Sequence, residues 1–362
     1  MSDHRPPLYE VHVALGAKFG SFGGWLMPLE YAGVLAEHAA VRESVGLFDV
    51  SHLGKLLVSG PGAAGYLNTR LTNDLGRIGP GQAQYTLLCN DAGGVVDDLI
   101  VYLFGNDHVL LVPNAANTAT VSAALGDGLP GGVAIANQHE DYVVLAVQGP
   151  SSGKVMAALG FPADMDYMAF ETARFDGQEL TVCRTGYTGE HGYELVAPNA
   201  VAEPLWAAIV SAGQPCGIRP CGLGARDTLR TEMGYPLHGQ DITPAINPVE
   251  AGLGWAIGWA KPSFDGGVPL RRAKQDGPAR RLCGIKAQAR GIPRAGMTVV
   301  GDDGAPLGEV TSGTFSPTLK TGIGLALVNA SVRAGDTVGV QVRQRVELFD
   351  VVRLPFVDSH VR

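Results

Sequence analysis

Apolar residues alternate with polar ones in some segments of the chain and recur every three to four residues in others, which predicts both strands and helices. Strands are predicted where short apolar runs stand between turn-forming residues, at 84–89, 95–104, 108–113, 142–148, 179–185 and 193–197. Helices are predicted where apolar residues mark one face, at 31–45, 152–159 and 202–212. His38 lies on the apolar stripe of the first helix, so we expect a structural role for it.

The stretch from residue 261 to 281 breaks this pattern with Gly, Pro and charged side chains. We predict a domain boundary near residue 280, because 362 residues exceed what one hydrophobic core usually supports. Beyond residue 282 strands alternate with turns and no helix is predicted, which is typical of a small barrel or sandwich. The expected class is α+β, with helices packed on antiparallel sheets.

Charge and composition narrow the possible functions. The formal net charge of −8 argues against a general affinity for nucleic acid, which requires clustered Lys and Arg. Residues 261–362 hold 15 Lys and Arg against 9 Asp and Glu, so this region carries +6 and the rest of the chain −14. The two parts therefore face different partners, or the basic region is an ordinary solvated surface.

Cysteine spacing and the N-terminus indicate the compartment. The five cysteines form no CxxC pair and no metal-ligand spacing with His, so no metal site is predicted. The N-terminus lacks the apolar core of a signal peptide, and no stretch is long and apolar enough to span a membrane. We expect a cytoplasmic protein with reduced thiols and no membrane association.

Two short motifs suggest other functions but lack their supporting residues. The segment 60–65, GPGAAG, fits a dinucleotide-binding turn, yet no acidic residue follows about 20 positions on, near Gln84 and Tyr85. The segment 149–153, GPSSG, fits the serine-hydrolase elbow, but His191, His238 and His360 stand in no supporting motif. We interpret the first as a turn that caps a helix, and Ser151 or Ser152 as a helix N-cap.

Asp97 and Asp98 interrupt an otherwise apolar strand. Because strand side chains alternate, the two carboxyl groups point to opposite faces, and one of them faces a cavity or the core. An ionised carboxylate there requires a cationic or hydrogen-bonding partner. The spacing fits a functional acid and a structural pair equally well.

Two later segments carry side chains suited to a flat ligand. The segment 186–194, GYTGEHGYE, combines aromatic faces with carboxylates, which suits a heterocycle with N–H donors along its edge. The segment 222–228, GLGARDT, opens a helix with Arg226 in its first turn, where the helix dipole does not favour a cation. Binding an acceptor group or a carboxylate would explain Arg226.

Segments along nearly the whole chain resemble the glycine cleavage T-protein, or aminomethyltransferase, family. They are PLYEVH (7–12), GGWLMPLEY (23–31), GLFDVSH (46–52), NDAGGVVDDLIVY (90–102), VQGP (147–150), TGYTGEHGYE (185–194), GLGARDTLRTEMGYPLHGQD (222–241) and TSGTFSPTL (311–319). The resemblance implies a three-domain, cloverleaf-like fold with folate in its central channel. Residues 1–280 would form two intertwined α+β subdomains, one of them ferredoxin-like at roughly 50–140, and residues 281–362 a β-barrel.

The resemblance also implies roles for individual residues. Asp97 matches the family's catalytic acid, and Glu194 and Arg226 match residues that contact the pterin. Further matches to the folate pocket are Tyr85, Asn114, Tyr187 and Trp255. A family contact made through a Tyr near the C-terminus has no counterpart in PFVDSHVR at 355–362.

The implied reaction transfers a methylene carbon from S-aminomethyldihydrolipoyl H-protein to tetrahydrofolate, giving 5,10-methylenetetrahydrofolate, ammonia and dihydrolipoyl H-protein. Tetrahydrofolate is then a co-substrate and lipoylated H-protein the partner, which we expect to dock on the basic region that includes Arg271, Arg272, Arg280 and Arg281. One alternative is a non-enzymatic folate-binding protein of iron–sulfur cluster assembly, but Pro236 stands where its motif has Cys. Another is a folate-dependent demethylase of a different methyl donor.

Overall fold

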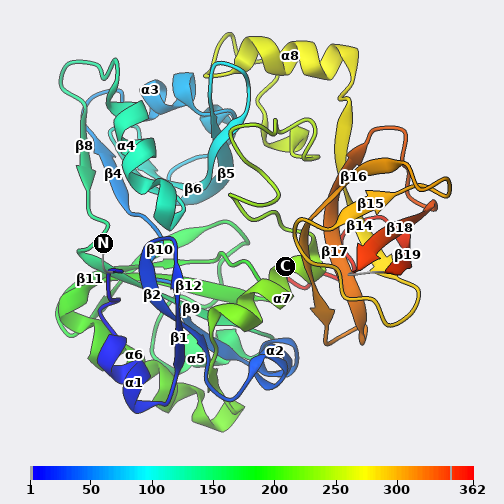
Figure 1. Ribbon diagram of the computed structural model, residues 1–362. Coiled ribbons are helices and arrows are strands. Elements are labelled where there is room, and N and C mark those ends of the chain that lie inside the picture. Colours follow the sequence, from blue (N-terminus) through cyan, green and yellow to red (C-terminus); the bar gives the residue numbers. More distant parts are fainter. Residues whose placement is uncertain (1–2, 343–344) are drawn as a thin grey trace.

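The computed structural model describes residues 3–342 and 345–362 and has a mixed α+β architecture (Figure 1). In this described part of the chain, the strands form a two-stranded hairpin, a six-stranded sheet, a five-stranded sheet and a six-stranded closed barrel. The predicted α+β class is confirmed, and of the two predicted C-terminal forms the chain adopts the barrel. None of the helices in the described part has the length and apolar character that a membrane crossing requires.

The six-stranded sheet has the strand order β10-β11-β12-β9-β3-β13. Its strands are β3 (Gly46–Asp49), β9 (Tyr142–Gln148), β10 (Phe170–Phe175), β11 (Gln178–Cys183), β12 (Gly192–Pro198) and β13 (Arg219–Pro220). One face is covered by helices α1 (Tyr9–Ala14), α5 (Ser152–Ala158) and α6 (Ala202–Gly213). Met156 and Trp206 from these helices pack with Leu145 and Leu195 of the sheet in one buried cluster.

The five-stranded sheet has the order β5-β6-β7-β4-β8. Its strands are β4 (Leu56–Ser59), β5 (Gln82–Cys89), β6 (Val95–Gly105), β7 (His108–Val112) and β8 (Ala134–Asn137). Helices α3 (Ala63–Arg70) and α4 (Thr118–Gly126) cover one face, where Leu67 and Leu125 meet Leu99 of β6. The opposite face packs on the six-stranded sheet, with Tyr102 of β6 against Val144 of β9.

The hairpin β1 (Lys18–Phe22) and β2 (Trp25–Glu30) precedes helix α2 (Val34–Glu43), which packs against helix α7 (Leu223–Met233). The predicted helix 31–45 is too long, because Gly33 has a φ of 104° and a buried carboxylate fixes the residues before the helix. Glu37 accepts the backbone N–H groups of Tyr31 at 2.6 Å and Gly33 at 3.1 Å, and that of Gly222 before α7 at 2.8 Å. One side chain therefore sets the start of both helices.

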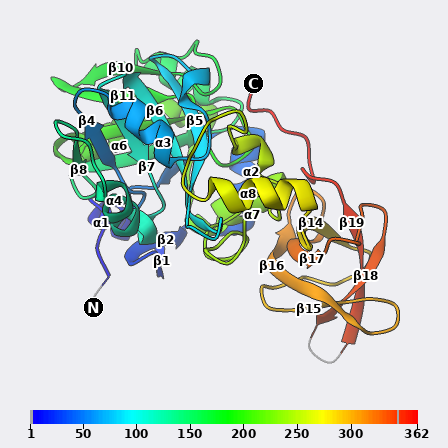
Figure 2. The same ribbon diagram turned by 90° about the horizontal axis from the view of Figure 1, so that it is seen from above.

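The predicted linker at 261–281 contains a helix, contrary to the prediction. Helix α8 spans Gly267–Asp276, with Pro269 in its first turn and Leu270 fully buried. Its single buried apolar residue gives a weak helical pattern, whereas the Gly and Pro residues around it are typical of a loop. Helix α8 lies at the edge of the molecule, above the connection between the sheets and the barrel (Figures 1 and 2).

Short 3-10 turns complete the helices, at η1 (Leu75–Arg77), η2 (Ala115–Asn117), η3 (Asn199–Val201), η4 (Gln214–Cys216) and η5 (Gly254–Ala256).

The closed barrel has the order β14-β17-β16-β15-β18-β19, and every pairing between its neighbouring strands is antiparallel. Its strands are β14 (Arg280–Ala287), β15 (Thr298–Val300), β16 (Pro306–Ser316), β17 (Thr321–Asn329), β18 (Thr337–Val342) and β19 (Arg345–Val352). Ile285, Val340 and Phe349 fill the interior. After β19 the chain runs back toward the six-stranded sheet (Figure 2), where the Arg184 guanidinium donates to the Val361 carbonyl at 2.6 Å.

Buried charges join helix α7 to the barrel. Arg230 of α7 is 2% exposed and donates to Asp241 at 2.8 Å and to Ser312 of β16 at 2.9 Å. Two residues further along α7, the fully buried Glu232 accepts a hydrogen bond from the hydroxyl of Ser316 at 2.5 Å and one from the guanidinium of Arg42 at 2.8 Å. Because these groups are buried, their pairing fixes the barrel to the helix that carries Arg226.

We expect this junction to make stability depend on pH. Burial alone would raise the pKa of Glu232, but hydrogen bonding and charge from His38, with Ser316 and Arg42, outweigh burial and lower the pKa to about 2. A carboxyl group with a lowered folded-state pKa stabilises the fold above its unfolded-state pKa and loses that contribution as pH falls through the folded value. The window therefore runs from about pH 4.5 down to about pH 2.

Urea unfolding at pH 7, 4 and 3 tests this expectation. The wild type should lose up to about 3 kcal/mol of unfolding free energy from this group across the window, since one pKa unit corresponds to about 1.4 kcal/mol. Glu232→Gln should be less stable at pH 7 and show a smaller loss on acidification. An equal slope in both proteins would mean that Glu232 does not couple folding to protons.

Candidate functional site

The two aspartates lie at the start of β6 and are held by the segment before α4. Asp97 is fully buried, and Asp98 is half-buried on the neighbouring position. The Asn114 side-chain amide donates to Asp97 Oδ1 at 2.9 Å and to Asp98 Oδ1 at 2.8 Å, and its backbone N–H donates to Asp97 Oδ2 at 3.0 Å. Asn117 adds a 2.6 Å hydrogen bond to Asp97 Oδ1. Neutral donors rather than a cation therefore surround the Asp97 carboxylate.

This arrangement perturbs both acids. Burial raises the pKa of Asp97 to about 8, the nearby charge of Asp98 adds to the increase, and the two asparagines only partly oppose it. Burial also raises the pKa of Asp98, although the hydrogen bonds that Tyr85 and Asn114 donate to its carboxylate oppose that increase. A carboxyl group whose pKa lies near neutrality can accept or release a proton at working pH, which is typical of a catalytic acid or base.

Aromatic side chains extend the site from Asp98 to the surface. The Tyr85 hydroxyl donates to Asp98 Oδ2 at 3.0 Å. The Tyr85 ring stacks on Trp255 of η5, with centroids 5.3 Å apart and planes 26° apart. Trp255 is 62% exposed, which is unusual for so large an apolar ring and leaves its outer face open to a ligand.

Tyr187 and Arg226 form the next part of the site. The Arg226 guanidinium lies 4.7 Å from the centre of the Tyr187 ring, which also stacks on Tyr235 at 5.6 Å. Arg226 Nη1 is buried and has no hydrogen-bond partner among the described residues. Because an unpaired buried donor is costly, this atom indicates the position of a ligand acceptor.

Glu194, on strand β12, supplies a hydrogen-bond acceptor to the site. It is 9% exposed, and the Thr185 hydroxyl donates to its Oε2 at 2.6 Å. Burial lowers the pKa of the Arg226 guanidinium, and the charges of Glu194 and Tyr187 partly oppose that effect, which places all three groups in one neighbourhood. The carboxylate and the guanidinium are therefore available as an acceptor and a donor for a polar ring edge.

Contacts link several of the predicted site residues: Trp255 to Tyr85, Tyr85 to Asp98, Asn114 to Asp97 and Tyr187 to Arg226. Asn117, Thr185 and His238 were missed in the sequence, and all three contact side chains of the site or of its first neighbours. For Asn117 a signal exists in retrospect, because the spacing Asn-x-x-Asn at 114–117 repeats an amide within one helical turn.

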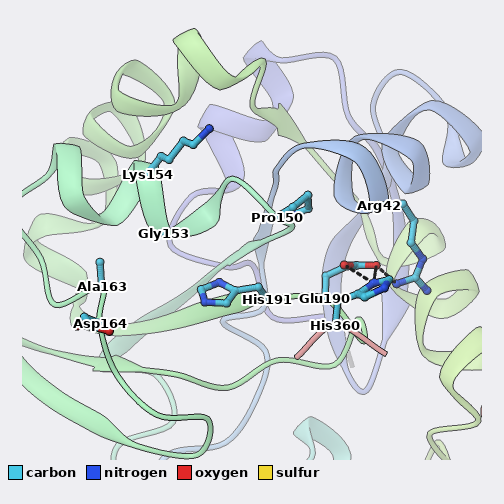
Figure 3. Close-up of a pocket in the computed structure, with 9 residues that line it drawn as sticks. All are labelled: Arg42, Pro150, Gly153, Lys154, Ala163, Asp164, Glu190, His191 and His360. Carbon is cyan, nitrogen blue, oxygen red and sulfur yellow. Dashed lines mark hydrogen bonds and ion pairs between the residues drawn. The ribbon is translucent and has the colours of Figure 1, made fainter. Parts of the chain in front are cut away.

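A surface hollow of about 770 Å³ lies elsewhere, beside α5 and the C-terminal segment (Figure 3). Its lining includes Arg42 and Glu190, which pair with each other at 2.8 Å. Figure 3 shows His360 beside Glu190 and Arg42, with His191 next to this group and Lys154 pointing away from it. Arg42 and Glu190 in this hollow are already paired with each other, and none of the predicted site residues lines it.

The two competing motifs have structural roles. Gly62 begins α3 with a φ of 82°, and its N–H binds the Asp107 carboxylate at 3.0 Å, so a protein group occupies the place of a phosphate. Ser151 is the N-cap residue of α5, as predicted, although its side chain makes no capping hydrogen bond. Ser152 Oγ lies 3.0 Å from His191 Nδ1, yet no carboxylate contacts His191 among the described residues.

The fold and the site together define an α+β protein with a buried acid, an open aromatic stack and a buried guanidinium, and with a β-barrel fixed to the helix that carries this guanidinium. Residues 8–261 match the family described as the GCVT N-terminal domain, and residues 280–358 match the glycine cleavage T-protein C-terminal barrel domain. The chain belongs to the glycine cleavage T-protein family of aminomethyltransferases, as the sequence resemblance predicted.

Relatives at high identity support this membership over the whole chain. An aminomethyltransferase from Parafrankia sp. (strain EAN1pec) is 60% identical over 360 residues, covering 99% of each protein. One from Mycolicibacterium paratuberculosis (strain ATCC BAA-968 / K-10) is 57% identical over 358 residues, covering 98% of this chain and 97% of the relative. The crystal structure of glycine cleavage system aminomethyltransferase T from Bartonella henselae has a TM-score of 0.93 at 35% identity and covers 98% of each chain.

Proposed function

We propose that this chain transfers the methylene carbon of S-aminomethyldihydrolipoyl H-protein to tetrahydrofolate. In this reaction one C–S bond and one C–N bond break, and two bonds form between folate nitrogens and the carbon. The two protons that leave those nitrogens end on the lipoyl thiol and on ammonia. The observation that carries the proposal is the convergence of a buried acid, an open aromatic stack and an unpaired guanidinium on a T-protein fold.

Each side chain has a place in this proposal. The pterin edge offers an amino group and a ring N–H to the Glu194 carboxylate and a carbonyl to Arg226 Nη1. Tyr187 faces the ring, and Tyr85 with Trp255 continues the aromatic surface outward. Asp97 orients the attacking nitrogen and stabilises the positive charge that develops on it. Asn114 donates to both aspartates, so its contribution to the pocket is to hold these acids.

The reaction is tested by incubating the protein with tetrahydrofolate and aminomethylated H-protein and measuring methylenetetrahydrofolate and ammonia. Equal amounts of both products support the proposal. Sarcosine and dimethylglycine serve as alternative donors, because a demethylase that works without an added oxidant would move a methyl group from one of them to tetrahydrofolate, giving 5-methyltetrahydrofolate and no ammonia. Folate binding without transfer from any donor would instead favour a non-enzymatic binding protein.

We also propose that the carrier docks on the basic region around α8. Of the four arginines predicted for this surface, Arg271 packs on Phe264 and Arg280 pairs with Glu250 at 2.9 Å, so both have internal contacts. The Arg272 side chain is 85% exposed and makes only a 3.3 Å contact with Asp276. Arg272 is therefore the arginine with the most freedom to meet an acidic partner.

Reversing Arg272 and Arg281 to Glu should lower the association rate of H-protein several-fold at low salt and weaken its salt dependence, because complementary charge mainly accelerates encounter. Stopped-flow association with lipoylated H-protein measures both effects. Arg174→Glu, at an exposed position of β10, is the matched control and should leave the rate unchanged. If the double reversal behaves like this control, the carrier docks elsewhere.

A further inference from the structure

The loop that follows α7 returns to the start of β6, two residues before Asp97. The backbone N–H of Val95 is bound by the carbonyls of Thr243 at 3.0 Å and Ile246 at 3.1 Å. The carbonyl of Val95 lies 3.1 Å from His238 Nε2. The loop after α7 therefore holds both the N–H and the carbonyl of Val95. His238 is the residue of this loop that contacts Val95 through its side chain.

These contacts select one form of the His238 ring. A backbone carbonyl can only accept a hydrogen bond. Nε2 of His238 must therefore carry a hydrogen and donate it to the Val95 carbonyl oxygen. In neutral imidazole the other nitrogen is then an acceptor, and Nδ1 lies 2.9 Å from the side-chain nitrogen of Asn117. Protonation of Nδ1 would place two donors against each other, so the contacts require neutral His238.

The side-chain N–H₂ group of Asn117 donates its two hydrogens to two different acceptors. One points to His238 Nδ1 at 2.9 Å, and the other to Asp97 Oδ1 at 2.6 Å. Rotation of the amide by 180° would turn its oxygen toward two acceptors, the Asp97 carboxylate and His238 Nδ1, and both would repel it. The acceptor Nδ1 of His238 therefore adds to the preference for the orientation in which the Asn117 N–H group meets Asp97.

We propose that His238 is a positioning residue for Asp97, acting through Asn117. This inference rests on the proposed function, since it assigns His238 to the transfer step in which Asp97 meets the folate nitrogen. The loop itself is anchored to α7, because Asp241 accepts both the backbone N–H of Leu237 at 2.8 Å and the guanidinium of Arg230 at 2.8 Å. The helix that presents Arg226 to the pterin thus also sets the orientation of the catalytic acid.

Positioning of Asn117 can be separated experimentally from anchoring of the loop. Positioning uses Nδ1 of His238, whereas loop anchoring uses Nε2. Asparagine places its side-chain oxygen near the position of Nδ1, so His238→Asn keeps an acceptor for Asn117 and loses the bond to Val95. Glutamine places its side-chain nitrogen near Nε2, so His238→Gln keeps the bond to Val95 and loses the acceptor for Asn117. Positioning predicts that Asn restores activity, whereas loop anchoring predicts that Gln does.

The experiment measures kcat, and KM for tetrahydrofolate, in the transfer assay with aminomethylated H-protein. His238→Ala and His238→Gln should each lower kcat about tenfold, as expected for losing a hydrogen-bond donor to a charged group, while KM stays within about twofold. His238→Asn should recover most of kcat. His191→Gln, a half-buried histidine bonded to Ser152, is the matched control and should leave kcat unchanged.

A double-mutant cycle completes the test. In the Asp97→Asn background, His238→Gln should change kcat less than twofold, because the group it orients is already lost. Full activity in His238→Gln, or the same tenfold loss in both backgrounds, would overturn the positioning role. Failure of the proposed function is a separate outcome, since the wild type would then form no methylenetetrahydrofolate.

Discussion

Asp97→Asn is expected to lower kcat for methylenetetrahydrofolate formation by about a hundredfold or more, the usual scale for losing a positioned acid–base or charge-stabilising group. The amide keeps the size of the carboxylate but cannot carry its negative charge. Burial disfavours the ionised form of Asp97, so the charge costs stability in the free protein and is useful only when a cation develops beside it. The substituted protein should therefore fold as stably as the wild type or more so.

Three measurements separate this effect from damage to the fold. The free energy of unfolding should not decrease, and the Kd for tetrahydrofolate should stay within a few-fold of the wild type. Asp91→Asn, at an exposed position in the turn before β6, is the matched control and should transfer normally. A fully active, well-folded Asp97→Asn protein would show that the buried acid serves the fold and not the reaction.

Glu194→Gln is expected to weaken tetrahydrofolate binding by about tenfold to a hundredfold, the scale of a charge-assisted hydrogen bond in a buried setting. A carboxylate accepts two parallel N–H bonds from the pterin edge, whereas an amide places its own N–H₂ against one of those donors. The neighbouring Thr185 hydroxyl already binds Oε2 at 2.6 Å, so the amide nitrogen has no costless orientation.

Fluorescence or calorimetric titration with tetrahydrofolate measures this loss directly. Most of it should appear in Kd and KM, with a smaller change in kcat, because the contact exists in both the ground state and the transition state. Glu171→Gln, at an exposed position of β10 in the same sheet, should bind like the wild type. An unchanged Kd for Glu194→Gln would remove Glu194 from the pocket.

Much of the fold is predictable from local pattern. The strand runs at 95–104 and 142–148 correspond closely to β6 and β9, because each is bounded by turn-forming residues and buries alternate or all side chains. Local pattern could not choose between barrel and sandwich, since closure depends on the pairing of β14 with β19, whose register partners are 62 to 68 residues apart. Helix α8 was missed because Leu270 carries the one buried apolar side chain among its ten residues.

Part of the candidate site is likewise predictable from the sequence, and part of it is not. The Asp97–Asp98 pair is visible in the sequence because charges interrupt an apolar strand, and its alternation across the strand follows from backbone geometry alone. The contact of Asn117 with His238 joins residues 121 positions apart and depends on how the loop after α7 returns to β6. No local pattern predicts such a contact, and only the tertiary structure reveals which donor meets which acceptor.

A crystal structure of the protein with bound tetrahydrofolate tests the central claim most directly. We expect the pterin edge to lie against Glu194, with a carbonyl within hydrogen-bond distance of Arg226 Nη1, the ring on Tyr187 and a reactive nitrogen beside Asp97. Folate bound in the hollow lined by Arg42 and Glu190, with Arg226 Nη1 still unpaired, would contradict the proposed site and the roles assigned to its residues.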